Sequence, residues 1–82
     1  MDDQYAKNLL LAAAKCDTLT RRENEITTLA RQVIDGSSSI AKMSLLWKIS
    51  DISNSEEALR NAGLREAIQE LNNSLMHFHN YE

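Results

Sequence analysis

Apolar residues recur at helical spacing over most of this chain, which leaves few folds open to it. Residues 26–34 place apolar side chains at i, i+3, i+4, i+7 and i+8, a pattern typical of a helix packed on one face. Near the C-terminus, five apolar residues are spaced 4, 3, 4 and 3, a heptad seam of the kind that pairs two helices. The spacing predicts an all-α fold, and the seam consists of Leu64, Ile68, Leu71, Leu75 and Phe78.

Serines and a glycine divide the helical pattern into a small bundle of three to four helices in one domain. The second helix is expected to stop at Asp35-Gly36, where Gly36 can adopt the left-handed conformation. Gly63 weakens the last helix, and at Asn61-Ala62-Gly63 the helix is either kinked or broken into two shorter ones. The domain spans residues 1–82, and the predicted helices cover about residues 4–16, 20–35, 40–49 and 54–77.

Two capping boxes are expected at helix starts. In this arrangement a hydroxyl accepts a hydrogen bond from the backbone amide three residues on, and a glutamate at that position returns one. Thr20 with Glu23 fits the pattern before the second helix, and Ser53 with Glu56 fits it before the last.

The chain carries more apolar helix surface than 82 residues can cover. One core of this size supplies at most about 5 kcal/mol of net stability, and a single cysteine cannot form an internal disulfide. Association of two or more copies of the chain is then the remaining way to stabilise the fold. We therefore expect a homodimer paired through the seam, with Trp47 as the next contact residue, and we expect Leu71→Asp to dissociate it.

The third helix is expected to be the most buried, because it carries two apolar stripes. Leu45 and Ile49 form one of them. A tryptophan on such a helix is usually a core residue, although aromatic anchors are also enriched at interfaces. The other stripe consists of Ile40, Met43, Leu46 and Trp47.

The net charge of −3 argues against non-specific binding to nucleic acids and against attachment to an anionic membrane. The longest apolar run, Leu9 to Ala14, is too short to span a bilayer or to serve as a signal peptide. We expect a cytoplasmic protein in which the lone thiol stays reduced.

No residue pattern in the sequence carries catalytic chemistry, so we expect no enzymatic activity and no cofactor. His77 and His79 are two residues apart and point to different sides of a helix, so no metal site is expected from them. Cys16 beside Lys15 fits a half-buried packing residue better than a redox sensor.

One further set of features covers some two-thirds of the chain and comprises Ala14-Lys15, Thr20, Glu23, the spacing Ile26-Leu29-Val33, Asp35-Gly36, residues 42–49 and a closing helix over 55–71. In these features the chain resembles the small enterobacterial regulators of biofilm and acid resistance, the YmgB/AriR and YcgZ family of two-component-system connector proteins. The resemblance implies a helical homodimer without enzymatic activity that binds a response regulator and so modulates transcription. It also implies an association with DNA in some cases.

Two other functions stay open. A helical co-chaperone or phage-type inhibitor would pair its helices with those of a partner protein, and its isolated chain would be poorly ordered. A helix-turn-helix repressor would use the second and third predicted helices to bind DNA. The recognition helix of such a repressor would offer few cations, Lys42 and Lys48. DNA binding by this chain alone is therefore the weakest of the three hypotheses.

Overall fold

The structure is a computed structural model that describes residues 3–36 and 39–81, with side chains described for 4–36 and 40–77. Helices make up nearly all of this described part of the chain. No strand occurs in that part, so the all-α prediction is confirmed. The five helices found there are α1 (Asp3–Thr20), α2 (Glu25–Ile34), α3 (Ser39–Ser53), α4 (Glu56–Arg60) and α5 (Ala62–Tyr81).

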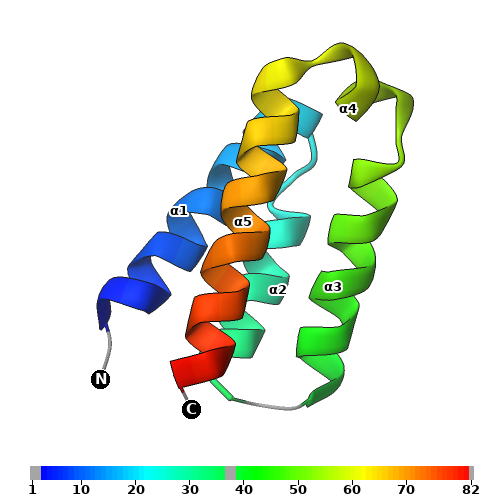
Figure 1. Cartoon of the computed structure of the whole chain (residues 1–82). Coiled ribbons are helices and arrows are strands. Elements are labelled where there is room, and N and C mark those ends of the chain that lie inside the picture. Colours follow the sequence, from blue (N-terminus) through cyan, green and yellow to red (C-terminus); the bar gives the residue numbers. More distant parts are fainter. Residues whose placement is uncertain (1–2, 37–38, 82) are drawn as a thin grey trace.

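Four of these helices form an up-down-up-down bundle, and the short α4 lies in the connection between α3 and α5 (Figure 1). Each long helix packs against its neighbour in sequence, and α5 returns to close the ring against α1. α1 and α5 form the most extensive contact, whereas α3 touches α5 much less. The bundle is therefore tightly closed on the α1 side and more open on the α3 side.

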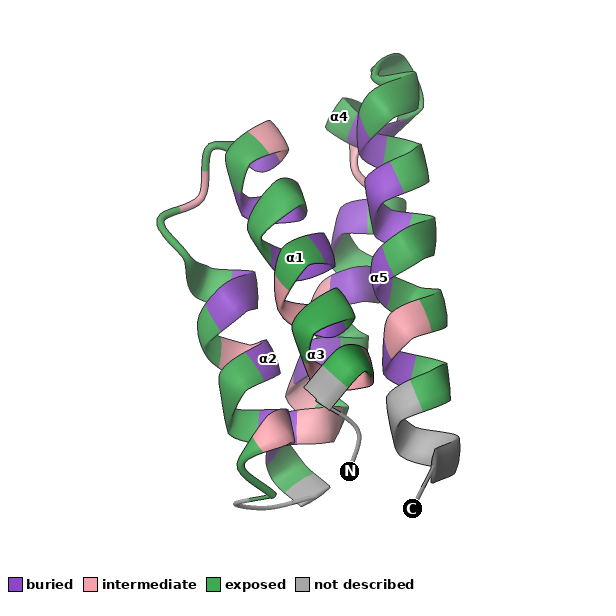
Figure 2. Ribbon diagram, turned by 90° about the vertical axis from the view of Figure 1, so that its left-hand side faces the viewer, coloured by how far each residue is buried: buried purple, intermediate pink, exposed green. Residues whose placement is uncertain are grey.

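The buried apolar side chains of the described residues belong to one cluster in the middle of the bundle. The buried positions recur along the inward sides of α1 and α5 (Figure 2). Each long helix contributes a stripe, because one face of every helix must leave water when four helices form a ring. The largest fully buried side chains are those of Leu9, Ile26, Leu45, Ile52, Leu64, Leu71 and Leu75.

The heptad seam lies inside the chain's own core, which corrects its assignment to a contact between copies. Four of its members, Leu64, Ile68, Leu71 and Leu75, are between 0% and 6% exposed. The seam lies on α5, which packs along α1 of the same chain. The side chain of Phe78 lies outside the described residues. The spacing correctly indicated a packed helix, but it did not tell whether the partner helix belongs to the same chain.

The first helix runs four residues further than predicted and ends in a Schellman motif. The backbone N–H of Arg22 donates to the carbonyl of Asp17 at 3.0 Å, and that of Arg21 donates to the carbonyl of Thr18 at 3.3 Å. Arg21 takes the left-handed conformation that this motif requires, with φ of 61°. The hydroxyl of Thr20 donates back to the carbonyl of Cys16 at 2.8 Å, so the predicted capping box at Thr20 is wrong.

A carboxylate from α1 caps α2 in place of that box. Asp17 is only 2% exposed, and its two oxygens accept from the backbone N–H groups of Ile26 and Thr27, each at 2.9 Å. The Thr27 hydroxyl donates to the same carboxylate. Asn24, the N-cap residue, has φ of 63° and makes no side-chain cap of its own. Asp17 therefore satisfies two of the orphan amides of α2 from a different helix and fixes α2 against α1.

The end of α2 matches the prediction. Gly36 has φ of 67°, and its backbone N–H donates to the carbonyl of Val33 at 3.0 Å. A glycine suits this position because a left-handed backbone strains residues that carry a Cβ.

The predicted last helix is broken in two, and the break falls at Asn61. The second capping box is also wrong, because Ser55 rather than Ser53 caps α4, accepting from the backbone N–H of Ala58 at 3.3 Å. Asn61 is extended, and its side-chain oxygen accepts from the backbone N–H of Leu64 at 3.1 Å. A Cβ on Gly63 would lie 3.2 Å from that oxygen, so the glycine leaves room for the cap.

The third helix is not the most buried, which corrects the expectation drawn from its two apolar stripes. α3 contacts α2 and α5, and its inward stripe consists of Ala41, Leu45, Ile49 and Ile52, between 0% and 7% exposed. Because the ring covers only one side of each helix, the second stripe faces outward. Its members Ile40, Met43, Leu46 and Trp47 are exposed.

Candidate functional site

The outward side of α3 presents the largest exposed apolar side chains that lie together on one helix among the described residues. Ile40 is 73% exposed, Met43 54% and Trp47 69%. They recur at helical spacing on one side, with polar residues between and beyond them. We call this side the α3 outer face, and it consists of Ile40, Met43, Ser44, Trp47, Lys48 and Asp51.

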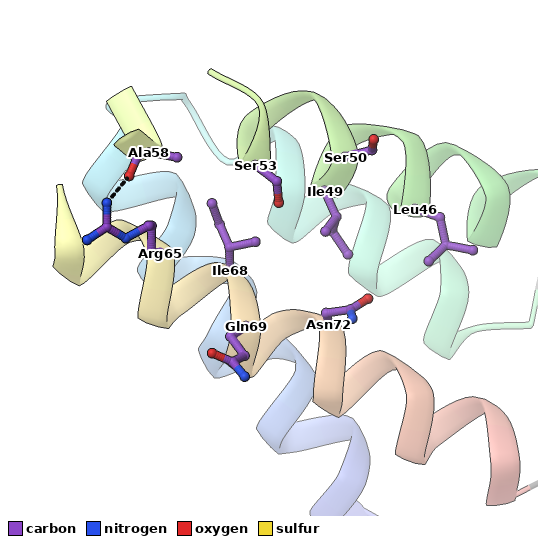
Figure 3. A pocket seen from close by; sticks show the side chains of 9 residues that line it. All are labelled: Leu46, Ile49, Ser50, Ser53, Ala58, Arg65, Ile68, Gln69 and Asn72. Atoms are coloured by element: carbon purple, nitrogen blue, oxygen red, sulfur yellow. Dashed lines mark hydrogen bonds between the residues drawn. The ribbon is translucent and has the colours of Figure 1, made fainter. Parts of the chain in front are cut away.

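A groove runs beside this face, between α3 and α5. Its volume is about 450 Å³, and it forms where α3 stands apart from α5. Leu46 and Ile49 extend from α3 toward Ile68 on α5, and Ala58 lies at one end (Figure 3). Leu46, 37% exposed, lies at the border of the groove and the α3 outer face. We call this hollow the α3–α5 groove, and its polar lining residues are Ser50, Ser53, Arg65, Gln69 and Asn72.

Among the residues with described side chains, Arg65 is the one charged residue that lines the groove. Its Nη1 donates to the carbonyl of Ala58 at 3.2 Å and to that of Leu59 at 2.8 Å, at the end of α4. These bonds hold the guanidinium at the α4 end of the groove. Its Nη2 and Nε take no part in them, and a guanidinium can bind a carboxylate through those groups.

The α3 outer face carries two charged residues, Lys48 and Asp51, and among the described residues only Lys48 of these two is paired within the chain. Lys48 Nζ lies 3.3 Å from the carboxylate of Glu25, and Arg22 lies 3.3 Å from the same oxygen. The hydrogen bond and charge of Lys48, helped by the charge of Arg22, lower the pKa of Glu25 below its ordinary value. Lys48 is therefore engaged within the chain. Asp51, one turn beyond Trp47, is exposed and leaves the face with an acidic group at its C-terminal end.

The predicted contact residues are thus separated by the fold. The four described seam residues lie in the core, as shown above, whereas Trp47 is exposed on α3. Ile40, Met43 and Arg65 were not singled out as site residues from the sequence. The sequence did contain a signal for Ile40 and Met43, because α3 has two apolar stripes and a helix in a four-helix ring can bury only one of them. The position of Arg65 depends on the break at Asn61, which the spacing alone did not fix.

Cys16 and His77, the titratable residues whose chemistry the sequence raised, have packing roles in the structure. Cys16 is fully buried, and burial together with the charges of Asp17 and Glu70 raises its pKa to about 11. Such a thiol is unreactive, which agrees with the packing role predicted for it. The His77 ring stacks on Tyr5 with centroids 6.0 Å apart. Among the described residues, no group of potential ligands gathers closely enough to hold a metal ion, and the side chain of His79 lies outside them.

The α2–α3 unit has the geometry of a helical hairpin. α3 runs back alongside α2 after the turn that begins at Asp35-Gly36 (Figure 1). In a helix-turn-helix the two helices cross at a large angle, so that the second one can enter the major groove. The side-by-side packing of α2 and α3 therefore gives the DNA-reading hypothesis no support.

No protein-family model, curated protein or solved structure matches this chain. The resemblance to the YmgB/AriR and YcgZ connector proteins therefore stays a prediction from the sequence. Within residues 3–36 and 39–81, no helix combines the length and the apolar character needed to cross a membrane.

Proposed function

We propose that this chain is a non-enzymatic regulatory interaction protein of the cytoplasm, a homodimer that binds a transcription or response regulator and modulates gene expression. The observation that carries the proposal is the α3 outer face, where Ile40, Met43 and Trp47 lie exposed together. The regulator as a partner rests on the resemblance described above, and the homodimer rests on the exposed apolar surface.

The size of the exposed apolar surface supports an interaction role. With Leu46 included, the exposed apolar side chains of α3 present a patch on the order of 500 Å². Patches of this size on small soluble proteins are often binding sites. A stable dimer typically buries roughly 800 Å² on each partner. The patch alone is short of that area, and the adjoining α3–α5 groove adds further surface.

The alternatives receive less support from the fold. A co-chaperone or inhibitor that pairs its helices with those of a partner was expected to be poorly ordered alone. Here the four long helices already enclose one continuous apolar core. A partner would therefore bind the outside of a bundle whose core is already formed, rather than supply a missing helix.

Light scattering over a range of concentrations tests the homodimer. We expect twice the chain mass of 9.3 kDa at high concentration and dissociation in the Ile40→Asp variant. Leu11→Asp is the matched control, because Leu11 is 63% exposed on α1, a helix distant from α3 in the ring. A wild-type chain that stays at 9.3 kDa at every concentration would contradict the homodimer.

Affinity capture from the native host, followed by mass spectrometry, tests the regulator. We expect a response regulator to be retained by the wild type and by Leu11→Asp. A capture that yields no transcription or response regulator in either sample would contradict that part of the proposal.

A further inference from the structure

We infer that two copies of this chain associate by placing Trp47 of each copy in the α3–α5 groove of the other. The inference rests on the proposed homodimer and specifies its contact. Its basis is that a protruding aromatic side chain and an apolar groove lie on adjacent sides of one helix. Leu46 forms the border between them. A two-fold axis beside α3 brings both features of each copy into contact at once, as an interface between identical surfaces requires.

The groove suits an indole in size and lining. It measures about 450 Å³, and its walls are formed by Leu46, Ile49 and Ile68. An aromatic side chain buries roughly 150–250 Å² when it is enclosed. Seating both tryptophans would therefore cover much of the exposed apolar patch and bring the buried area toward that of a stable dimer.

The charges favour a second copy as the occupant. The described lining of the groove carries a single charged group, Arg65 at its α4 end. A complementary occupant therefore needs an apolar side chain with an acid about one turn away. The α3 outer face has this pattern, because Asp51 follows Trp47 by four residues. The nearby cation, Lys48, is already paired with Glu25. Placing Asp51 near Arg65 of the other copy sets the two α3 helices parallel.

Neighbouring residues on α5 provide a matched pair of variants. Asn72 and Asn73 are both exposed, but only Asn72 lines the groove. We expect Asn72→Arg to weaken dimerisation by at least about tenfold, because the larger charged side chain occupies the position of the indole. Asn73→Arg should dimerise as the wild type does. If the two substitutions weaken dimerisation equally, or if neither does, the inference is overturned, whereas the proposed homodimer is not. A wild type that never dimerises would overturn both.

Disulfide cross-linking then identifies the surfaces in contact. A parallel arrangement brings Ser44, one turn before Trp47, near the Asn72 end of the partner's groove. Mixing Ser44→Cys chains with Asn72→Cys chains should give a cross-linked heterodimer, whereas Ser44→Cys with Asn73→Cys should not. The native Cys16 is buried and should not compete. Cross-linking of Ser44→Cys chains to Asn73→Cys chains but not to Asn72→Cys chains would overturn the inference.

Discussion

α5 and α3 carry apolar residues at similar helical spacing, yet the fold buries one stripe and exposes the other. Leu64, Leu71 and Leu75 on α5 are at most 1% exposed, whereas Ile40 and Trp47 on α3 are about 70% exposed. The difference lies in the neighbours rather than in the spacing. α5 packs along the 18-residue α1, while α3 has its inner stripe against α2 and little contact with α5. Apolar periodicity thus identifies a surface that needs a partner, and the topology decides whether the chain supplies it.

The same substitution on the two stripes should give opposite results. Leu71→Asp places a charge in the core without a partner, and we expect the chain to be unfolded, because the cost exceeds the roughly 5 kcal/mol available to a domain of this size. Ile40→Asp should remain folded. Circular dichroism and urea unfolding at low concentration provide the measurement. A folded monomer of Leu71→Asp would show that α5 does not form the core contact described here.

Asp17 holds the closed side of the bundle together, and its removal should have the next largest effect. Asp17→Ala leaves the amides of Ile26 and Thr27 without their carboxylate, so we expect a loss of about 3 kcal/mol in the free energy of unfolding. The exposed Asp35, replaced by alanine, is the control and should change stability little. Equal unfolding midpoints for the two variants would contradict the capping role of Asp17.

The burial of Cys16 predicts a pH dependence. The pKa of the thiol is raised from 9.0 to about 11, so the folded chain holds this proton more tightly than the unfolded chain does. This contribution to stability is fully present below about pH 9 and is lost as the pH rises through about 11, with a total of at most about 3 kcal/mol. Urea unfolding of wild type and Cys16→Ala between pH 8 and 11 measures it. Parallel profiles for the two chains would show that burial does not perturb the thiol.

The smallest effect is expected at the end of α1. Arg21 holds a left-handed conformation at a cost that glycine avoids, so Arg21→Gly should raise stability by about 0.5–1 kcal/mol. Gly36→Ala, at the corresponding position after α2, should lower stability by a similar amount. Thermal unfolding of both variants distinguishes the signs. A destabilised Arg21→Gly variant would indicate that the arginine side chain contributes more than its backbone costs.

The positions of the helices were predicted from the sequence better than their caps and the contacts between them. Apolar spacing located the long helices, and Gly36 marked the end of α2, because these signals are local. The capping boxes failed because other residues supply the caps, Asp17 for α2 and Ser55 for α4. Asp17 reaches α2 from another helix, a contact between residues nine and ten positions apart that no local pattern contains. The last helix breaks at Asn61, within the segment Asn61-Ala62-Gly63 where a kink or a break was predicted.

The candidate site was only partly predictable for the same reason. Trp47 was singled out as an aromatic anchor, but the side of α3 that faces outward depends on how α2 and α5 flank it. Leu64, Ile68, Leu71 and Leu75 had the spacing of a contact between helices, and the structure places that contact within one chain. A monomeric core and a dimer seam follow the same spacing rule, so periodicity could not separate them.

Trp47 fluorescence tests most directly whether the α3 outer face is a contact surface. The chain contains one tryptophan, so the emission reports on this face alone. If the face is covered in a dimer, dilution should shift the emission to longer wavelength over the same concentration range in which light scattering shows dissociation. An emission typical of a solvent-exposed indole at every concentration, including those at which the chain is dimeric, would contradict the account.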